Sequence, residues 1–232
     1  MTQQMKYSYI AVLVISLALV IGFFTLRTKR IIAEASQTSE VGEVAKVKKQ
    51  DYSELRSSLA KIKAIDVVIG SEDAPITIFE YASYSCSHCA NFSSRVYPKL
   101  KEEYMDKGIV RFVLRDFPLD EPSLRAAQLS RCVGDTSYEA LSKTLFEQRQ
   151  NWAYGKDFPE KLENIAKIVG ISGDDFHACI GDKQLEEQIL DYRYEVSQAY
   201  NISSTPSFII NGKKYNGNNS FAALSEYLNK IQ

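Results

Sequence analysis

The pattern of strand and helix signals changes twice along this chain, and this change restricts the possible folds more than any other feature. Two short β-rich runs, 64–69 and 76–82, are followed by a helical stretch over 87–107, where Pro98 predicts a kink, and by a third strand candidate over 109–115. From residue 121 to about residue 200 only helical periodicity is present. The first part of the chain therefore predicts an α/β unit that is interrupted by a block of helices.

The strand signal returns only near the C-terminus, over 207–215, where Asn211-Gly212 predicts a tight hairpin turn. Residues 221–231 then close the chain as an amphipathic helix. The helical block comprises four predicted segments, 121–133, 137–150, 158–169 and 174–200. Because the block separates two halves of one α/β pattern, we expect an inserted helical subdomain and not a second domain in sequence.

The N-terminus holds 17 uncharged residues, 10–26, which is the lower limit for a helix that crosses a bilayer. The residues Ala33-Glu34-Ala35 have the small-x-small form of a signal-peptide cleavage site. Against cleavage and export, Arg27, Lys29 and Arg30 follow the apolar run directly and are typical of a cytoplasmic flank. A cleaved signal peptide and a membrane anchor both remain open at this point.

The chain therefore divides into three predicted parts. Residues 1–35 are a signal peptide or membrane anchor, and 36–63 are a polar linker followed by an N-terminal helix. Residues 64–232 form the α/β domain, with the helical insertion at about 120–185.

The charge balance excludes two classes of partner. After residue 35 the chain has 24 basic and 28 acidic side chains, so it has no electrostatic reason to bind nucleic acid or anionic lipid. Membrane contact is expected only through the N-terminal segment. A body of this size folds without cross-links, so the four cysteines need an explanation from chemistry or from the redox compartment.

Two of these cysteines form the motif Cys86-Ser87-His88-Cys89, where a β-run ends and a helix begins. The unpaired N–H groups and partial positive charge of a helix start favour a thiolate at Cys86, which is the species that attacks a disulfide. Cys89, three residues later, is placed to close a disulfide with it. The spacing predicts a reversible two-electron couple, and a protonated His88 would add positive charge beside the same sulfur.

The competing interpretation is half of a zinc site. A closed zinc site needs four ligands, and the only other candidates are Cys132, Cys179 and His177, which do not form a second closely spaced pair. We therefore expect no metal.

These motifs together resemble the thioredoxin fold in its DsbA-like form, over about residues 64–232. The resemblance rests on the CSHC motif after a strand, the inserted helical block, and the stretch TPSFIINGKKYNG over 205–217. It implies a protein thiol–disulfide oxidoreductase with Cys86 and Cys89 as its catalytic pair.

The resemblance also implies roles for three further positions. Glu80, six residues before Cys86, matches a buried acid that relays a proton, although a solvated acid on an edge strand is the alternative. Thr205-Pro206 matches a cis-proline loop that binds extended substrate, although an ordinary trans proline is the alternative.

Cys132 and Cys179, 47 residues apart, resemble a second disulfide that some DsbA-like relatives carry in the helical insertion. On the chain-entropy model such a bridge would stabilise the fold by roughly 4 kcal/mol. Two buried free thiols are the alternative.

The function that we expect is disulfide formation in exported client proteins with free thiols, in the periplasm. The family implies reoxidation by a DsbB-like membrane partner, and no organic cofactor is needed because the cysteine pair carries the electrons. Two rivals remain open. One is an isomerase or reductase on the same fold, and the other is a non-catalytic zinc- or substrate-binding module.

Overall fold

The computed structural model describes residues 51–232, and Tyr52–Gln232 form one compact unit. The expected signal peptide or anchor over 1–35, and the expected linker over 36–50, lie outside the described residues. Between residues 51 and 232, no helix combines the length and the hydropathy that crossing a bilayer requires.

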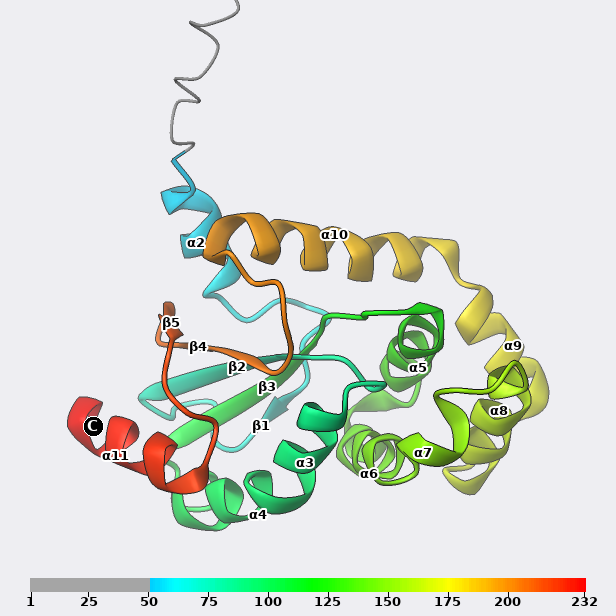
Figure 1. Ribbon diagram of the computed structural model, residues 1–232, viewed down its shortest axis with the longest axis horizontal. Helices are drawn as coiled ribbons and strands as arrows, with labels where there is room; N and C mark the ends of the chain where they lie inside the picture. The colour runs from blue at the N-terminus through cyan, green and yellow to red at the C-terminus, as the bar shows by residue number, and fades with distance from the viewer. Residues whose placement is uncertain (1–50) are drawn as a thin grey trace, which may run out of the picture. The chain divides into compact units, whose positions relative to one another are not determined.

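A mixed sheet with the strand order β1-β3-β2-β4-β5 forms the centre of the unit (Figure 1). The strands are β1 (Val68–Ile69), β2 (Ile76–Ala82), β3 (Val110–Asp116), β4 (Ser207–Ile210) and β5 (Lys213–Tyr215). β2 and β3 pair in parallel, and the other neighbouring strands pair antiparallel. Because β2 lies between two strands and under helices on both faces, all seven of its residues are buried, as its β-branched and aromatic sequence favours.

Helices cover both faces of the sheet. They are α2 (Ser53–Leu59), α3 (Ser87–Arg95), α4 (Tyr97–Leu100), α5 (Glu121–Arg131), α6 (Gly134–Glu147), α7 (Arg149–Trp152), α8 (Phe158–Ile168), α9 (Gly173–Gly181), α10 (Lys183–Tyr200) and α11 (Phe221–Ile231). Figure 1 shows α2 and α10 on one side of the sheet and α3, α4 and α11 on the other.

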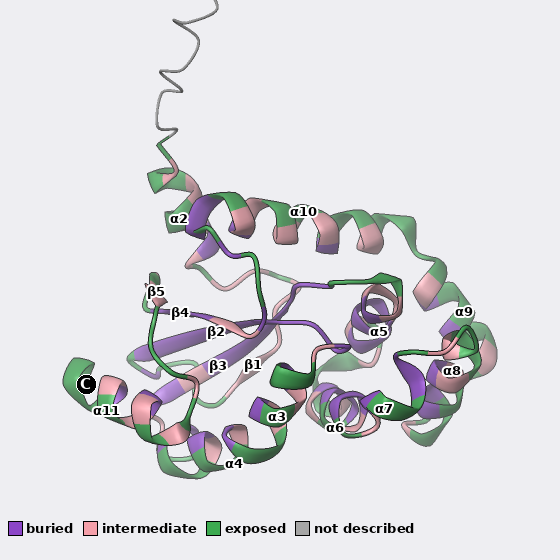
Figure 2. Ribbon diagram, viewed as in Figure 1, coloured by how far each residue is buried: buried purple, intermediate pink, exposed green. Residues whose placement is uncertain are grey.

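Strand β2 separates two hydrophobic cores because its side chains alternate between the two faces. Ile78 and Ala82 pack into the core under α3, whereas Phe79 and Tyr81 pack into the core under α2 and α10. Figure 2 shows the continuous burial of β2 and the exposed outer face of α10.

The predicted α/β pattern with an inserted helical block is confirmed in these residues. The helical run continues through Tyr200, beyond the expected end of the insertion near residue 185, because α10 leads back to the sheet. Val196, Ala199 and Tyr200, near its C-terminal end, pack into the same core as Phe79. α10 is therefore shared between the insertion and the sheet domain.

The strand expected over 64–69 is shorter than predicted. Only Val68 and Ile69 pair with β3, because Asp66 closes a turn in which its carboxylate accepts the N–H of Lys63. The same carboxylate pairs with the buried Arg115 guanidinium at 2.6 Å.

The helix expected over 87–107 is broken. α3 ends before Val96, α4 follows, and Lys101–Met105 is π-helical. Pro98 lacks an N–H and its ring crowds the carbonyl of the preceding turn, which explains a break at this point.

Candidate active site

The turn between β2 and α3 places two thiols at the start of a helix. The N–H of Cys86 donates to the Ser83 carbonyl at 3.0 Å, and the Cys86 carbonyl accepts the N–H of Ala90 at 3.1 Å, which begins the first turn of α3. Cys86 is thus the N-cap of α3, with extended backbone angles (φ −78°, ψ 126°). Its side chain is half-buried, Cys89 is buried, and both are free thiols in this structure.

The surroundings of Cys86 favour its thiolate. A hydrogen bond from the Cys89 thiol is the largest influence that lowers the pKa of Cys86, and it outweighs the opposing effect of partial burial. The Thr205 side chain and the backbone N–H groups of Cys89 and His88 act in the same direction. Together they lower the pKa of Cys86 to about 5, so the side chain is a thiolate at neutral pH.

The environment of Cys89 has the opposite effect. Its side chain is fully buried, and burial raises the pKa of Cys89 far above that of an ordinary thiol. The hydrogen bond to Cys86 and the charge of Glu80 raise the pKa of Cys89 further. One sulfur is therefore an accessible thiolate and the other is a protected thiol, which is the division between an attacking and a resolving cysteine.

The loop before β4 lies against Cys86 and contains the cis peptide bond Thr205–Pro206. The Cys86 thiol donates to the Thr205 carbonyl at 3.4 Å. Thr205 Oγ1 is buried and has no hydrogen-bond partner among the described residues. A thiolate at Cys86 would accept a hydrogen bond from this hydroxyl, and the Thr205 side chain accordingly lowers the pKa of Cys86.

Glu80 lies beneath the thiols on the central strand and not on a solvated edge. It pairs with Leu114 of β3 and Phe208 of β4, so its side chain points to the core that also contains Cys89. Only 3% of Glu80 is exposed, and its Oε1 has no hydrogen-bond partner among the described residues. Burial, followed by the negative charge of Cys86, raises the pKa of Glu80 well above its usual range.

His88 is exposed on the first turn of α3. Its backbone N–H contributes to lowering the pKa of Cys86, whereas its imidazole is not among the groups that do so. Redox tuning by the His88 side chain stays a prediction.

Sequence reasoning missed two residues at the rim of this site. Arg149 of α7 is buried, donates to the carbonyl of Ser85 at 3.2 Å, and lies 5.2 Å from the ring centre of Tyr154. The Tyr154 hydroxyl donates to the same carbonyl at 3.4 Å, although its side chain is 64% exposed. No motif marks either residue, because only the packing of the helical block brings them next to Cys86.

Cys132 and Cys179 form a disulfide between the end of α5 and α9, with their Cα atoms 6.2 Å apart. Cys132 is exposed and Cys179 is buried. Trp152 is a fully buried core residue, and 67% of the His177 side chain is exposed. Within residues 51–232, no group of three His, Cys, Asp or Glu side chains is placed to hold a metal ion.

Comparison with known protein families matches residues 63–230 to the family described as thioredoxin. A Rickettsia conorii protein with the provisional name protein-disulfide oxidoreductase is 30% identical over 197 residues, which cover 84% of this chain and 71% of that protein. Among five Rickettsia relatives of this kind, the aligned segments span between 56% and 71% of the relatives' length. Disulfide bond formation protein D of Bacillus subtilis is 26% identical over 151 residues, 63% of this chain and 68% of that protein.

Among solved structures, alpha-DsbA1 of Wolbachia pipientis superposes with a TM-score of 0.70 at 30% sequence identity. The match covers 76% of this chain and 94% of that protein. Both the predicted thioredoxin fold with a helical insertion and the predicted resemblance to DsbA-like proteins are therefore confirmed.

Proposed function

Because this chain belongs to the thioredoxin family and is a protein-disulfide oxidoreductase, we propose that it acts as an oxidant. In this role it transfers the Cys86–Cys89 disulfide to thiols of exported proteins. The observation that carries the proposal is the opposite environment of the two sulfurs, with a stabilised thiolate at Cys86 and a buried thiol at Cys89.

The exchange proceeds in two displacements. A substrate thiolate attacks Cys86 Sγ of the oxidised pair, a mixed disulfide forms, and Cys89 leaves as a thiolate that takes up a proton. A second substrate thiolate then attacks the substrate sulfur of the mixed disulfide, and Cys86 leaves as a thiolate. The substrate gains a disulfide and loses two electrons, which the enzyme keeps as its reduced cysteine pair.

The low pKa of Cys86 favours this direction because it stabilises the reduced enzyme. A pKa of about 5 corresponds to stabilisation at pH 7 of up to roughly 2.7 kcal/mol, or about 60 mV for a two-electron couple. Cys86 is only half-buried, so screening by solvent makes these figures upper bounds. Cys89 does not contribute to this stabilisation of the reduced enzyme because it remains a thiol at neutral pH.

Two neighbouring groups have supporting roles in the proposal. Glu80 gives a proton to Cys89 as it leaves and recovers one when the pair is reoxidised, because burial raises its pKa and favours the protonated carboxyl. The Thr205–Pro206 loop holds the substrate segment in an extended conformation beside Cys86.

We place the working site outside the cytoplasm, in the periplasm. The Cys132–Cys179 disulfide supports this location because such bonds persist in oxidising compartments. In this proposal the uncharged run 10–26 directs export or anchors the chain, and a DsbB-like membrane protein reoxidises the cysteine pair.

The test is the reduction potential of Cys86–Cys89 in the full chain, equilibrated in mild detergent against glutathione buffers. A value between about −120 and −180 mV is expected for an oxidant or isomerase, and a value near about −270 mV would identify a reductant and overturn the proposal. Oxidation of a reduced test protein distinguishes an oxidant from an isomerase. An oxidant introduces the disulfides, whereas an isomerase chiefly rearranges disulfides that are already present.

A further inference from the structure

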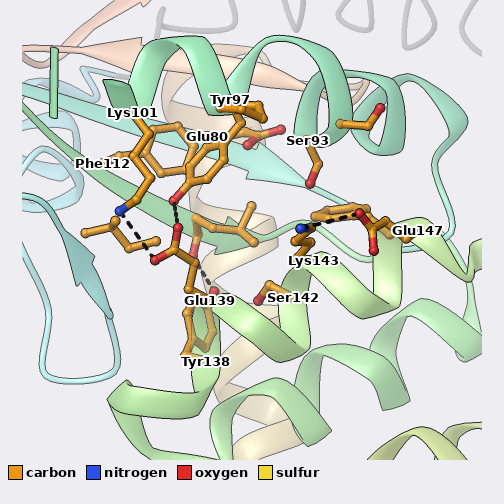
Figure 3. A pocket seen from close by; sticks show the side chains of 15 residues that line it. Glu80, Ser93, Tyr97, Lys101, Phe112, Tyr138, Glu139, Ser142, Lys143 and Glu147 are labelled. Carbon is orange, nitrogen blue, oxygen red and sulfur yellow. Dashed lines mark hydrogen bonds and ion pairs between the residues drawn. The ribbon is translucent and has the colours of Figure 1, made fainter. Parts of the chain in front are cut away.

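A cavity of about 320 Å³ lies between the sheet and the helical block. Its lining comes mainly from β2, β3, α3, α4 and α6 (Figure 3). Phe112, Leu114 and Phe146 give it apolar walls. Cys86 and Cys89 are not part of the lining, so the cavity is a separate space. Its volume lies at the lower end of the range for small-molecule sites, roughly 300–1,000 Å³.

The rim of the cavity carries charges that already have partners. Glu139 accepts a hydrogen bond from the Tyr97 hydroxyl at 2.8 Å and pairs with Lys101 at 3.5 Å. Glu147 pairs with Lys143 at 3.8 Å. Within each pair the opposite charges cancel, and both pairs are at least partly exposed to solvent; Figure 3 shows the two pairs among the side chains that line the cavity.

Glu80 is the buried polar side chain in the lining that has an oxygen without a hydrogen-bond partner in the described part of the chain. It is 97% buried, it reaches the cavity from the central strand, and its Oε1 has no hydrogen-bond partner among the described residues. A buried carboxyl oxygen without a partner costs free energy, which a ligand with a hydrogen-bond donor would recover. The cavity thus offers apolar walls and a single buried acceptor.

We propose that this cavity binds a small apolar amine, whose ammonium group donates to the carboxyl of Glu80 and whose hydrocarbon part packs against Phe112, Leu114 and Phe146. An ammonium ion suits the site better than an anion because the unmatched group is acidic. The rings of Tyr97 and Phe112 in the lining add favourable faces for a cation.

Binding of the amine is coupled to loss of a proton. Burial raises the pKa of Glu80 and so favours its neutral carboxyl, from which an ammonium ion would form a carboxylate–ammonium pair with release of one proton. With Cys86 and Cys89 joined as a disulfide, neither thiol titrates. The other titratable side chains in the lining are Tyr97, Lys101, Tyr138, Glu139, Lys143 and Glu147.

The experiment is isothermal titration of the oxidised full chain, in mild detergent, with 2-phenylethylamine and with its neutral counterpart 2-phenylethanol. At pH 8 we expect the amine to bind at least tenfold more tightly than the alcohol. We also expect the amine to bind more tightly at pH 8 than at pH 6. Because a proton is released, the measured heat should differ between phosphate and Tris buffers. Binding of the alcohol should be the same at both pH values.

Two variants test the location of the site. Glu80→Gln should remove the preference for the amine, the pH dependence and the proton release. Ser93→Phe places a ring in the cavity and should abolish binding of both probes. Ser137→Phe is the matched control, because Ser137 is also partly buried but does not line the cavity, and it should leave binding unchanged.

Equal affinity for the amine and the alcohol would overturn the proposal, and so would failure of the amine to bind. Binding of the amine that persists in Ser93→Phe would place it elsewhere and would also overturn it. These outcomes do not depend on the direction of disulfide exchange, because every measurement uses binding and not activity.

Discussion

The sulfur of Cys86 lies 3.4 Å from the carbonyl oxygen of Thr205, although 119 residues separate them in the sequence. The contact follows from strand pairing. β4 runs antiparallel to β2, with Ser207 opposite Tyr81. The start of β4 therefore lies beside the end of β2, and the loop before β4 meets the turn after β2 at this end of the two strands. The reactive thiol and the cis peptide are therefore brought together by the sheet and not by local sequence.

Thr205→Val should raise the pKa of Cys86. Valine has the same shape but lacks the hydroxyl that donates to the thiolate, and losing one hydrogen bond to a charged group corresponds to about one pKa unit. The measurement is the absorbance of the thiolate at 240 nm during a pH titration of the reduced protein. Thr205→Ser should restore the low pKa, and an unchanged value in the valine variant would show that the hydroxyl has no such role.

Arg149→Met should slow substrate oxidation several-fold at neutral pH. The guanidinium donates to the carbonyl of Ser85, directly before Cys86. Loss of this hydrogen bond removes a contact that fixes the turn in which Cys86 lies. Steady-state oxidation of a thiol peptide gives the readout, with Arg149→Lys expected to recover part of the rate. Full activity in the methionine variant would remove Arg149 from the site.

The chemistry of the site was predictable from sequence where it depends on neighbours in the chain. Cys86 and Cys89 lie in one helical turn, and the signals for strand 76–82 and helix 221–231 match the structure. The hairpin at Asn211-Gly212 was predictable too, since both residues have positive φ, which this turn requires. In each case the local preference and the final fold agree.

The parts that were not predictable depend on residues distant in the sequence. Asp66 looks like part of a strand until Arg115 is known to lie beside it, and the burial of Glu80 depends on which strands flank β2. Arg149 and Tyr154 join the site only because the helical block folds back onto the turn after β2. Periodicity does not contain this information.

Replacing Cys132 and Cys179 together with alanine should lower the free energy of unfolding by about 2–4 kcal/mol. The bridge closes a loop over a sequence separation of 47 residues, and its loss frees the unfolded chain. Chemical denaturation of the oxidised protein measures the change. Disulfide exchange at Cys86 should continue in the folded variant, because the bridge lies between α5 and α9 and not in the turn after β2. Unchanged stability would mean that the bridge does not constrain the unfolded state.

The reduced protein should gain stability relative to the oxidised protein as the pH rises from 5 to 8. The pKa of Cys86 is lowered to about 5 in the folded state from an ordinary value near 9, so its contribution is fully present above the unfolded pKa and is lost as the pH falls towards 5. The oxidised protein lacks this term because its sulfurs do not titrate. Glu80 acts in the opposite sense in both forms, since its raised pKa makes folding less favourable as the pH rises, and this effect largely cancels in the comparison.

The measurement is the melting temperature of the reduced and of the oxidised protein at each pH. The change of their difference with pH isolates the contribution of Cys86. The corresponding difference in the free energy of unfolding should change with pH by at most about 1.4 kcal/mol per pH unit, and screening at the half-buried sulfur should reduce this slope. Cys86→Ser, which cannot form the Cys86–Cys89 disulfide, should melt at the same temperature with and without reductant gentle enough to leave Cys132–Cys179 intact. A difference between reduced and oxidised protein that stays constant from pH 5 to 8 would contradict a low pKa at Cys86, and with it the basis for oxidant activity.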